Sequence, residues 1–118
     1  MDHQNQAFLP DDLVIGDVRI SVRQRTVNVN TAQVAFTRRE FDMLYLLAKH
    51  PGWAYTKEQL LGAAWGNTSD SNHHAVENMI FWLRRKLRLS ANVKIQTIVG
   101  YGYRLVVEEN QNKTRNIP

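Results

Sequence analysis

Hydrophobic positions in the first third of the chain alternate with polar ones. The run Val18-Arg19-Ile20-Ser21 shows this two-residue period within the segment 13–36. Alternation that uses β-branched residues is typical of half-buried antiparallel strands. Residues that favour turns divide the segment at three places: Gly16-Asp17, Arg23-Gln24 and Asn30-Thr31. The pattern therefore predicts a meander of up to four strands.

The pattern then changes to a helical period. Thr37 and Glu40 match a capping box, and apolar residues on one face follow them up to Lys49, which predicts a first helix. Thr56 has Gln59 three residues after it, so we expect a second helix from Thr56 to about Trp65. Each predicted helix thus carries its own start signal.

A third helix is predicted from Ser71 or Asn72 to about Leu89. One apolar stripe at helical spacing should face the core, and it consists of Val76, Ile80, Leu83 and Leu87. A second set at the same spacing falls on a different face, which we expect to be exposed: Asn78, Phe81, Trp82 and Arg85. Two large aromatic residues on an exposed face call for an explanation, whether as core of a larger bundle, as a protein-contact patch or as DNA contacts.

The end of the pattern predicts two strands, 94–99 and 103–107, around the turn Gly100-Tyr101-Gly102. Strands, three helices and a hairpin in this order predict an α+β fold, a winged helix-turn-helix with an N-terminal antiparallel meander and a C-terminal hairpin wing. Such a fold places its third helix in a DNA major groove and its hairpin on the flanking backbone or minor groove. We expect the folded domain to span 13–108, with a flexible lead-in at 1–12 and a polar tail at 109–118.

Charge is segregated along the chain. The 118 residues carry a net charge of +4, yet the stretch 78–107 holds six basic residues and no acidic one. This is the pattern that a nucleic-acid-binding face leaves in a sequence, although a solvated basic surface leaves the same one. Charge alone keeps both interpretations open.

Several classes of function are disfavoured. The chain has no cysteine, which excludes disulfides and thiolate chemistry and is compatible with a reducing cytoplasm. It shows no long apolar run, no signal peptide, no phosphate-binding glycine-rich loop and no defensible Ser, His and acid set. His73-His74 lacks further ligands at metal spacing. We therefore expect no enzyme, cofactor, metal, membrane partner or small-molecule substrate.

Particular stretches of the sequence resemble a known family. They are the stretch 36–41 (FTRREF), the HPG turn at 50–52, KEQLL at 57–61, Ala64-Trp65-Gly66, LRRKL at 83–87 and QTIVGYGYRL at 96–105. Together they resemble the OmpR/PhoB-type effector domain of bacterial two-component response regulators. The resemblance implies a transcriptional regulator that binds double-stranded direct-repeat DNA as a dimer or tandem pair, with the loop after Trp65 facing RNA polymerase. The receiver domain of that family is not within these residues, so we expect an isolated effector half or a stand-alone regulator.

The resemblance also implies site residues. It places Trp65 near the DNA backbone, Thr97 at a phosphate and Val99 at the minor groove. The third-helix positions that it assigns to DNA are His74, Ala75, Glu77, Asn78, Met79, Phe81, Trp82 and Arg84. Residue chemistry adds that Asn78 can read adenine and that an aromatic ring can pack on a thymine methyl. Phosphate contacts are expected from Arg84, Arg85, Lys86 and Arg88, whereas His74 and Tyr101 are either near DNA or simply solvated.

At three places this sequence differs from the family pattern, so the family's DNA contacts cannot all be assigned to it. His74-Ala75 stands where Arg-Thr is usual, Phe81-Trp82 where a polar or basic pair is usual, and Val99 where Arg is frequent. Several expected DNA contacts are therefore missing. Two hypotheses follow: a DNA-reading regulator, or a winged-helix protein-interaction module that uses Phe81 and Trp82 as a partner or self-association patch.

Overall fold

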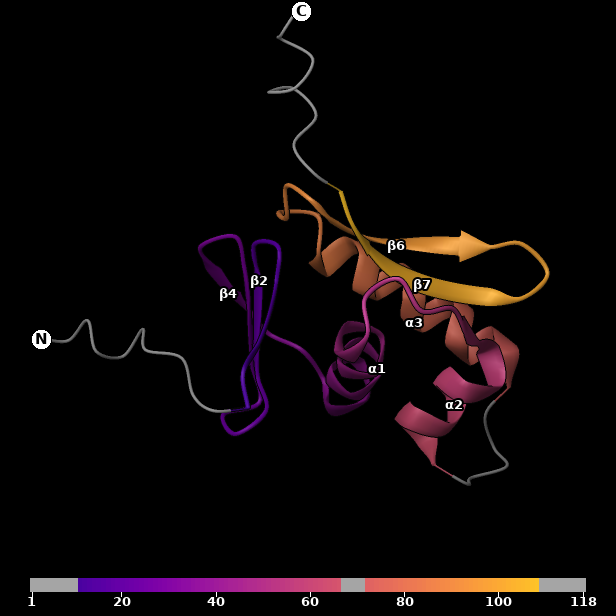
Figure 1. Ribbon diagram of the computed structural model, residues 1–118. Helices are drawn as coiled ribbons and strands as arrows, with labels where there is room; N and C mark the ends of the chain where they lie inside the picture. Colours follow the sequence, from indigo (N-terminus) through magenta and orange to yellow (C-terminus); the bar gives the residue numbers. More distant parts are fainter. Residues whose placement is uncertain (1–10, 67–71, 109–118) are drawn as a thin grey trace, which may run out of the picture.

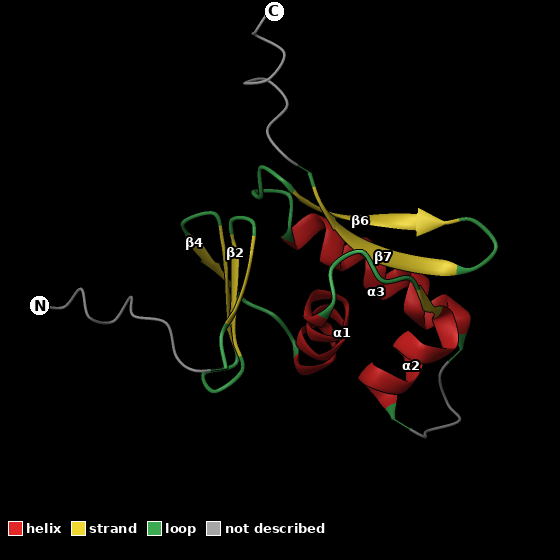
Figure 2. Cartoon of the chain, viewed as in Figure 1, coloured by secondary structure: helices red, strands yellow, loops and turns green. Residues whose placement is uncertain are grey.

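The computed structural model describes residues 11–66 and 72–108 (Figure 1). The chain order is four strands, a helix, a two-residue strand, two helices and a hairpin (Figure 2). These elements confirm the predicted α+β class and their order. The predicted tail at 109–118 and all but two residues of the predicted lead-in at 1–12 lie outside the described residues.

The first sheet is the predicted meander. Its strands are β1 (Leu13–Ile15), β2 (Val18–Ser21), β3 (Thr26–Val29) and β4 (Ala32–Val34), antiparallel and paired in the order β1-β2-β3-β4. Val18 pairs with Val29 and Ile20 with Val27, and all four side chains are buried. Positive φ angles occur at the turns, at Gly16 (56°), Arg25 (57°) and Asn30 (61°). The alternation therefore predicted both the strands and their inward face.

Each helix begins at a capping residue. Helix α1 (Arg38–Lys49) has the Thr37–Glu40 capping box, and α2 (Lys57–Trp65) has the Thr56–Gln59 box, as the sequence predicts. Helix α3 (His73–Lys86) is capped by the Asn72 side chain, which accepts from the Ala75 amide at 3.2 Å. Cap side chains satisfy amides that have no partner within the helix.

Helix α3 is shorter than the predicted segment, which extended to 88 or 89. The Leu87 amide still donates to the Leu83 carbonyl, but Arg88 donates to Arg85 and Ser90 to Leu87. The bonds thus change from four-residue to three-residue spacing, which tightens the last turn and ends the α-helix. The predicted end of the helix, at 88 or 89, was therefore two or three residues too late.

The C-terminal sheet has one strand more than predicted. Strands β6 (Val93–Ile98) and β7 (Gly102–Val107) form the expected hairpin, but β5 (Tyr55–Thr56) pairs with β7 on its other side. The predicted hairpin is therefore confirmed, but the third strand of its sheet was not predicted. Two residues are too few to show a period-two pattern, which is why β5 escaped detection. Gly102 permits this pairing, because a Cβ there would lie 1.9 Å from the Tyr55 carbonyl oxygen.

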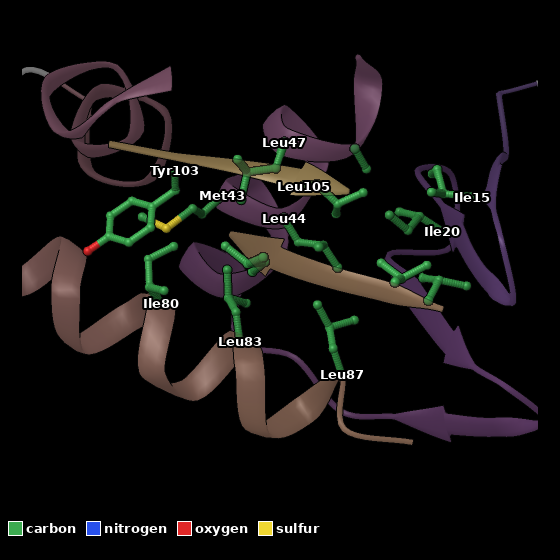
Figure 3. Packing of buried hydrophobic residues seen from close by; sticks show 14 of the residues in the cluster. Ile15, Ile20, Met43, Leu44, Leu47, Ile80, Leu83, Leu87, Tyr103 and Leu105 are labelled. Carbon is green, nitrogen blue, oxygen red and sulfur yellow. The ribbon is translucent and has the colours of Figure 1, made fainter. Parts of the chain in front are cut away.

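One core joins the two sheets and the three helices. Figure 1 shows α1 between the four-stranded sheet and the other helices, with the β6–β7 hairpin lying along α3. Ile15 and Ile20 from the meander, Leu44 from α1, Leu83 from α3 and Leu105 from β7 share this core (Figure 3). Tyr55 and Tyr103 are also buried in this core, whereas Trp53 is 57% exposed and stacks on His50 at 3.8 Å between ring centroids.

The meander is also anchored to the segment after α3. Asp17 accepts from the Ala91 amide at 2.7 Å and from the Ser90 hydroxyl. On the neighbouring turn, the Asn30 side-chain amide donates to the Leu89 carbonyl at 3.3 Å. These bonds fix the end of α3, and therefore the direction in which its exposed face points, relative to the first sheet. None of the helices in the described part of the chain is long and apolar enough to cross a membrane.

Candidate nucleic-acid interface

Helix α3 has one buried face and one exposed face. Ile80, Leu83 and Leu87 point toward the core in Figure 3, and Val76 is fully buried with them. Of the residues on the opposite face, Phe81 is 52% exposed and Trp82 is 44% exposed. The predicted division of the helix is confirmed. The exposure of Phe81 and Trp82 also excludes the interpretation of these residues as core of a larger bundle.

Phe81, Trp82 and Arg85 form a cluster on the exposed face. The two rings meet edge to face, with centroids 5.2 Å apart and an interplanar angle of 83°. The Arg85 guanidinium carbon lies 5.7 Å from the Phe81 centroid and 5.8 Å from that of Trp82. Such contacts are favourable and restrict the side chains to defined positions. We call these three residues the aromatic–arginine cluster.

Arg84 connects α3 to the wing. Its guanidinium donates from Nε and Nη2 to the Ile95 carbonyl, at 3.1 and 2.9 Å, and from Nη2 to the Thr97 hydroxyl at 2.8 Å. The same group lies 5.8 Å from the ring centroid of Tyr103. Two predicted DNA-contacting residues, Arg84 and Thr97, therefore bind each other and hold the hairpin against the helix. Their contact with DNA remains a prediction.

The start of α3 carries a network of ion pairs. The Lys57 ammonium lies 2.8 Å from Glu77, His74 Nδ1 lies 3.4 Å from the same carboxylate, and His73 Nε2 lies 2.9 Å from Glu58. The hydrogen bond from Lys57 lowers the pKa of Glu77, and Glu77 in turn raises the pKa of Lys57. His74 is therefore exposed but already beside a carboxylate, and a phosphate would compete with Glu77 for it.

The tip of the wing exposes apolar and aromatic side chains. Val99 is 93% exposed and Tyr101 is 50% exposed, on a turn closed by the Tyr101 amide and the Ile98 carbonyl at 2.9 Å. Gly100 adopts a φ of 76° there, a conformation that favours glycine. Tyr101 thus lies where the sequence predicts, at an accessible tip.

The two other cations predicted to contact phosphates, Arg88 and Lys86, have different surroundings. Arg88 is exposed and donates to the Arg85 carbonyl at 3.3 Å. Lys86 instead donates from its ammonium to the Ala35 carbonyl, between β4 and α1, at 2.8 Å, and to the Glu40 carboxylate of α1. Lys86 therefore stabilises the fold, although the charge count placed it with the phosphate-binding residues.

Trp65 lies at the junction of α2 and α1. It is half-buried, and the Arg39 guanidinium carbon lies 5.0 Å from its ring centroid. Both residues line a surface hollow together with Met79 of α3. The sequence gives no signal for this contact, because Arg39 and Trp65 are 26 positions apart and belong to different helices. The loop after Trp65, residues 67–71, lies outside the described residues.

Residues 30–105 match the family model described as "Transcriptional regulatory protein, C terminal". The chain belongs to this OmpR/PhoB-type family. Membership confirms the predicted resemblance, and it makes the chain a transcription-regulator domain of the DNA-binding winged-helix type and not an enzyme. Within the described residues, no group of three or more His, Cys, Asp or Glu is placed to hold a metal ion.

Relatives of this OmpR/PhoB-type domain include curated proteins and solved structures. Response regulator ArlR of Staphylococcus haemolyticus is 36% identical over 94 residues, which cover 79% of this chain and 43% of that protein. This chain therefore spans less than half the length of that relative. The DNA-binding domain of Bacillus subtilis CssR is 31% identical with a TM-score of 0.67, over 75% of this chain and 99% of that one.

A third relative was solved with DNA. The RstA DNA-binding domain of Klebsiella pneumoniae, in complex with the RstA box, is 29% identical with a TM-score of 0.70. The match covers 81% of this chain and 97% of that one. These likenesses, together with the elements described above, confirm the winged-helix fold of this OmpR/PhoB-type domain.

Proposed function

We propose that this chain is the DNA-binding effector domain of a response regulator, with α3 in the major groove and the β6–β7 wing on the flanking backbone. The observation that carries the proposal is the link made by Arg84 between an exposed helix face and the wing. The wing and the part of α3 from residue 78 onward lie within the stretch 78–107, which has six basic residues and no acidic one. A positive helix and hairpin in fixed relation suit a duplex, because cationic groups displace counterions from its phosphates.

The contacts we assign follow from exposure and chemistry. The side chain of Asn78 is exposed on α3 and has no hydrogen-bond partner among the described residues. Its side-chain amide is therefore available to an adenine edge. Arg85 and Arg88 supply positive charge beside the groove, and Tyr101 and Val99 approach the backbone or minor groove at the wing tip. Trp65 and His74 contribute at the edge of the interface.

Two further partners belong to the proposal. The family resemblance supports binding of two copies to repeated DNA sites, and it supports contact between RNA polymerase and the loop after Trp65. Each of these is separable from DNA binding itself.

A protein-interaction role for α3 is the second candidate. The exposed Phe81 and Trp82 rings favour it, since apolar surface of this kind is found at protein interfaces. In that case, substituting both rings by Ser would abolish self-association or partner binding and leave duplex affinity intact. If duplex affinity falls instead, the helix face binds DNA.

Salt-dependent binding tests the proposal directly. We expect the protein to bind a pool of random duplexes, with an affinity that falls steeply as salt rises from about 50 to 200 mM. Replacing Arg85 by Ala should weaken binding and reduce the log–log salt slope by about 1 if Arg85 neutralises a phosphate. Arg23→Ala is the matched control, because Arg23 is an exposed arginine on the meander paired with Asp11. Absence of binding at low salt would contradict the proposal.

A further inference from the structure

The exposed face of α3 offers few side chains for hydrogen bonding to bases. Arg84 is engaged by the wing, and Glu77 is engaged by Lys57 and His74. Along the centre of the face this leaves Asn78 at one end and the aromatic–arginine cluster at the other. A helix that reads DNA with this face therefore presents aromatic surface to the bases across one full turn.

The two rings contact each other and Arg85 on the exposed face. Phe81 and Trp82 stand three and four residues after Asn78, so they flank the line from Asn78 to Arg85 on the helix surface. Arg85 covers part of both rings, and Trp82 also lines a groove with residues 32–35 of the first sheet. The remaining exposed ring surface faces away from the protein. An aromatic surface held in this way can discriminate by shape.

The major groove offers one kind of group that fits such a surface. Adenine, guanine and cytosine present only hydrogen-bond donors and acceptors there, while thymine adds a C5-methyl group. Covering a donor or acceptor with an aromatic ring costs free energy, because the group loses water and gains no partner. Covering a methyl group is favourable. The preferred sites are therefore those with methylated pyrimidines beneath the rings.

We propose that Phe81 and Trp82 recognise the C5-methyl groups of pyrimidines in the major groove next to the base pair read by Asn78. The inference rests on the proposed function and specifies its base preference. An adenine read by Asn78 is paired with a thymine, so both kinds of contact favour A·T pairs. 5-Methylcytosine carries the same methyl group at the same position and should bind the same ring surface.

Replacing thymine by deoxyuridine removes the methyl group and leaves the hydrogen-bonding pattern unchanged. Duplexes are first selected from a random library with the wild-type protein, and each thymine of a selected site is then replaced singly. At one or two positions we expect affinity to fall roughly fourfold per methyl, the value expected for one buried methyl group. At a position of this kind, replacing T·A by C·G and then methylating that cytosine at C5 should recover a similar factor.

A double-mutant cycle assigns the effect to the rings. In the variant Phe81→Ala/Trp82→Ala, thymine and deoxyuridine duplexes should bind equally at those positions. Trp53→Ala is the matched control, since Trp53 is an equally exposed aromatic that stacks on His50 at the end of α1. This control should keep the full methyl dependence.

The outcomes separate the two proposals. If the wild-type protein binds selected duplexes tightly but tolerates deoxyuridine at every position, the methyl inference is wrong and the proposed DNA binding stands. An equal loss in wild type and double variant would also overturn the inference, because the methyl would then act through DNA shape. If no duplex binds, both proposals fail. The deoxyuridine series on the wild type needs no variant, so it decides even if the double variant does not fold.

Discussion

Both faces of α3 carry large apolar side chains, but those of the inner face are buried and those of the outer face are exposed. On the inner face, Val76, Ile80 and Leu83 are at most 1% exposed and contribute to the common core. On the outer face, Phe81 and Trp82 are about half exposed and contact each other and Arg85. Hydrophobicity alone therefore does not distinguish structural from functional residues in this helix. Position relative to the rest of the fold does.

The largest expected difference is between Leu83 and Phe81. Leu83→Ala should lower the free energy of unfolding by about 2–5 kcal/mol, because it leaves a cavity in a closed core. Phe81→Ala should lower it by less than about 1 kcal/mol, since much of the ring is already in water. Urea titration of both variants measures the difference. Similar losses in the two variants would mean that the outer face is also part of the core.

A second comparison concerns the neighbouring cations Lys86 and Arg85. Lys86→Met should cost roughly 1–3 kcal/mol of stability, because Glu40 would be left as a buried carboxylate without its cation. Arg85→Met should leave stability nearly unchanged and weaken DNA binding. Denaturant titration and duplex binding of both variants check this. Equal stability of the two variants would show that the Lys86–Glu40 pair contributes nothing.

The Lys86 variant also has a predicted pH dependence. Burial raises the pKa of Glu40, but hydrogen bonds from Lys86 and the Thr37 amide outweigh it and hold the pKa below 4.5. In the wild type, the ionised Glu40 therefore contributes to folding stability above pH 4.5. This stabilisation is lost as the pH falls through the lowered pKa. In Lys86→Met burial dominates, so the folded state favours the protonated acid. The stability gap between the two proteins should narrow as the pH falls from 7 to about 4.

A smaller effect distinguishes positioning from phosphate binding at Arg84. Arg84→Lys keeps the charge but cannot bind Ile95 and Thr97 with a forked group. We expect a stability loss of about 1 kcal/mol and a severalfold loss of duplex affinity with an unchanged salt slope. Wild-type affinity in Arg84→Lys, together with a reduced slope in Arg84→Ala, would instead identify Arg84 as a direct phosphate contact.

The smallest effect is expected at Glu77. This carboxylate lies at the start of α3, and the hydrogen bond from Lys57 lowers its pKa, so it stays charged at neutral pH. Glu77→Gln removes a negative charge beside the proposed groove and frees Lys57 and His74 for phosphates. Duplex affinity at low salt should rise a fewfold, and the gain should shrink as salt increases. A loss of affinity would mean that Glu77 positions the helix.

Local signals in the sequence predicted much of the fold. Both capping boxes lie within four residues of chain, and the alternation in 13–36 predicted the strands, although the polar Ser21 is also buried. Strand β5 was not predicted, because it forms by pairing with β7. The end of α3 was placed too late, because it depends on the hydrogen bonds of the last turn. The local sequence pattern thus predicts most helices and strands, whereas tertiary contacts determine where they begin and end.

The candidate site was less predictable for the same physical reason. The sequence grouped four cations as phosphate contacts, yet their surroundings differ: Arg84, Arg85, Lys86 and Arg88. Lys86 binds Glu40, which is 46 residues away, and Arg84 binds a carbonyl on β6. Arg85 lies with Phe81 and Trp82 on the outer face, and Arg88 is also exposed. A charge count cannot separate them, because a rotation of 100° per residue sends adjacent helix positions to different surroundings.

NMR can locate the surface by which the outer face of α3 and the wing tip are proposed to bind duplex DNA. Amide chemical-shift changes are mapped while a selected duplex is added to the labelled protein. We expect changes concentrated at residues 74–85 and 97–101, with little change at the meander turn 22–25. Changes confined to the meander, or none at saturating duplex, would contradict the proposal.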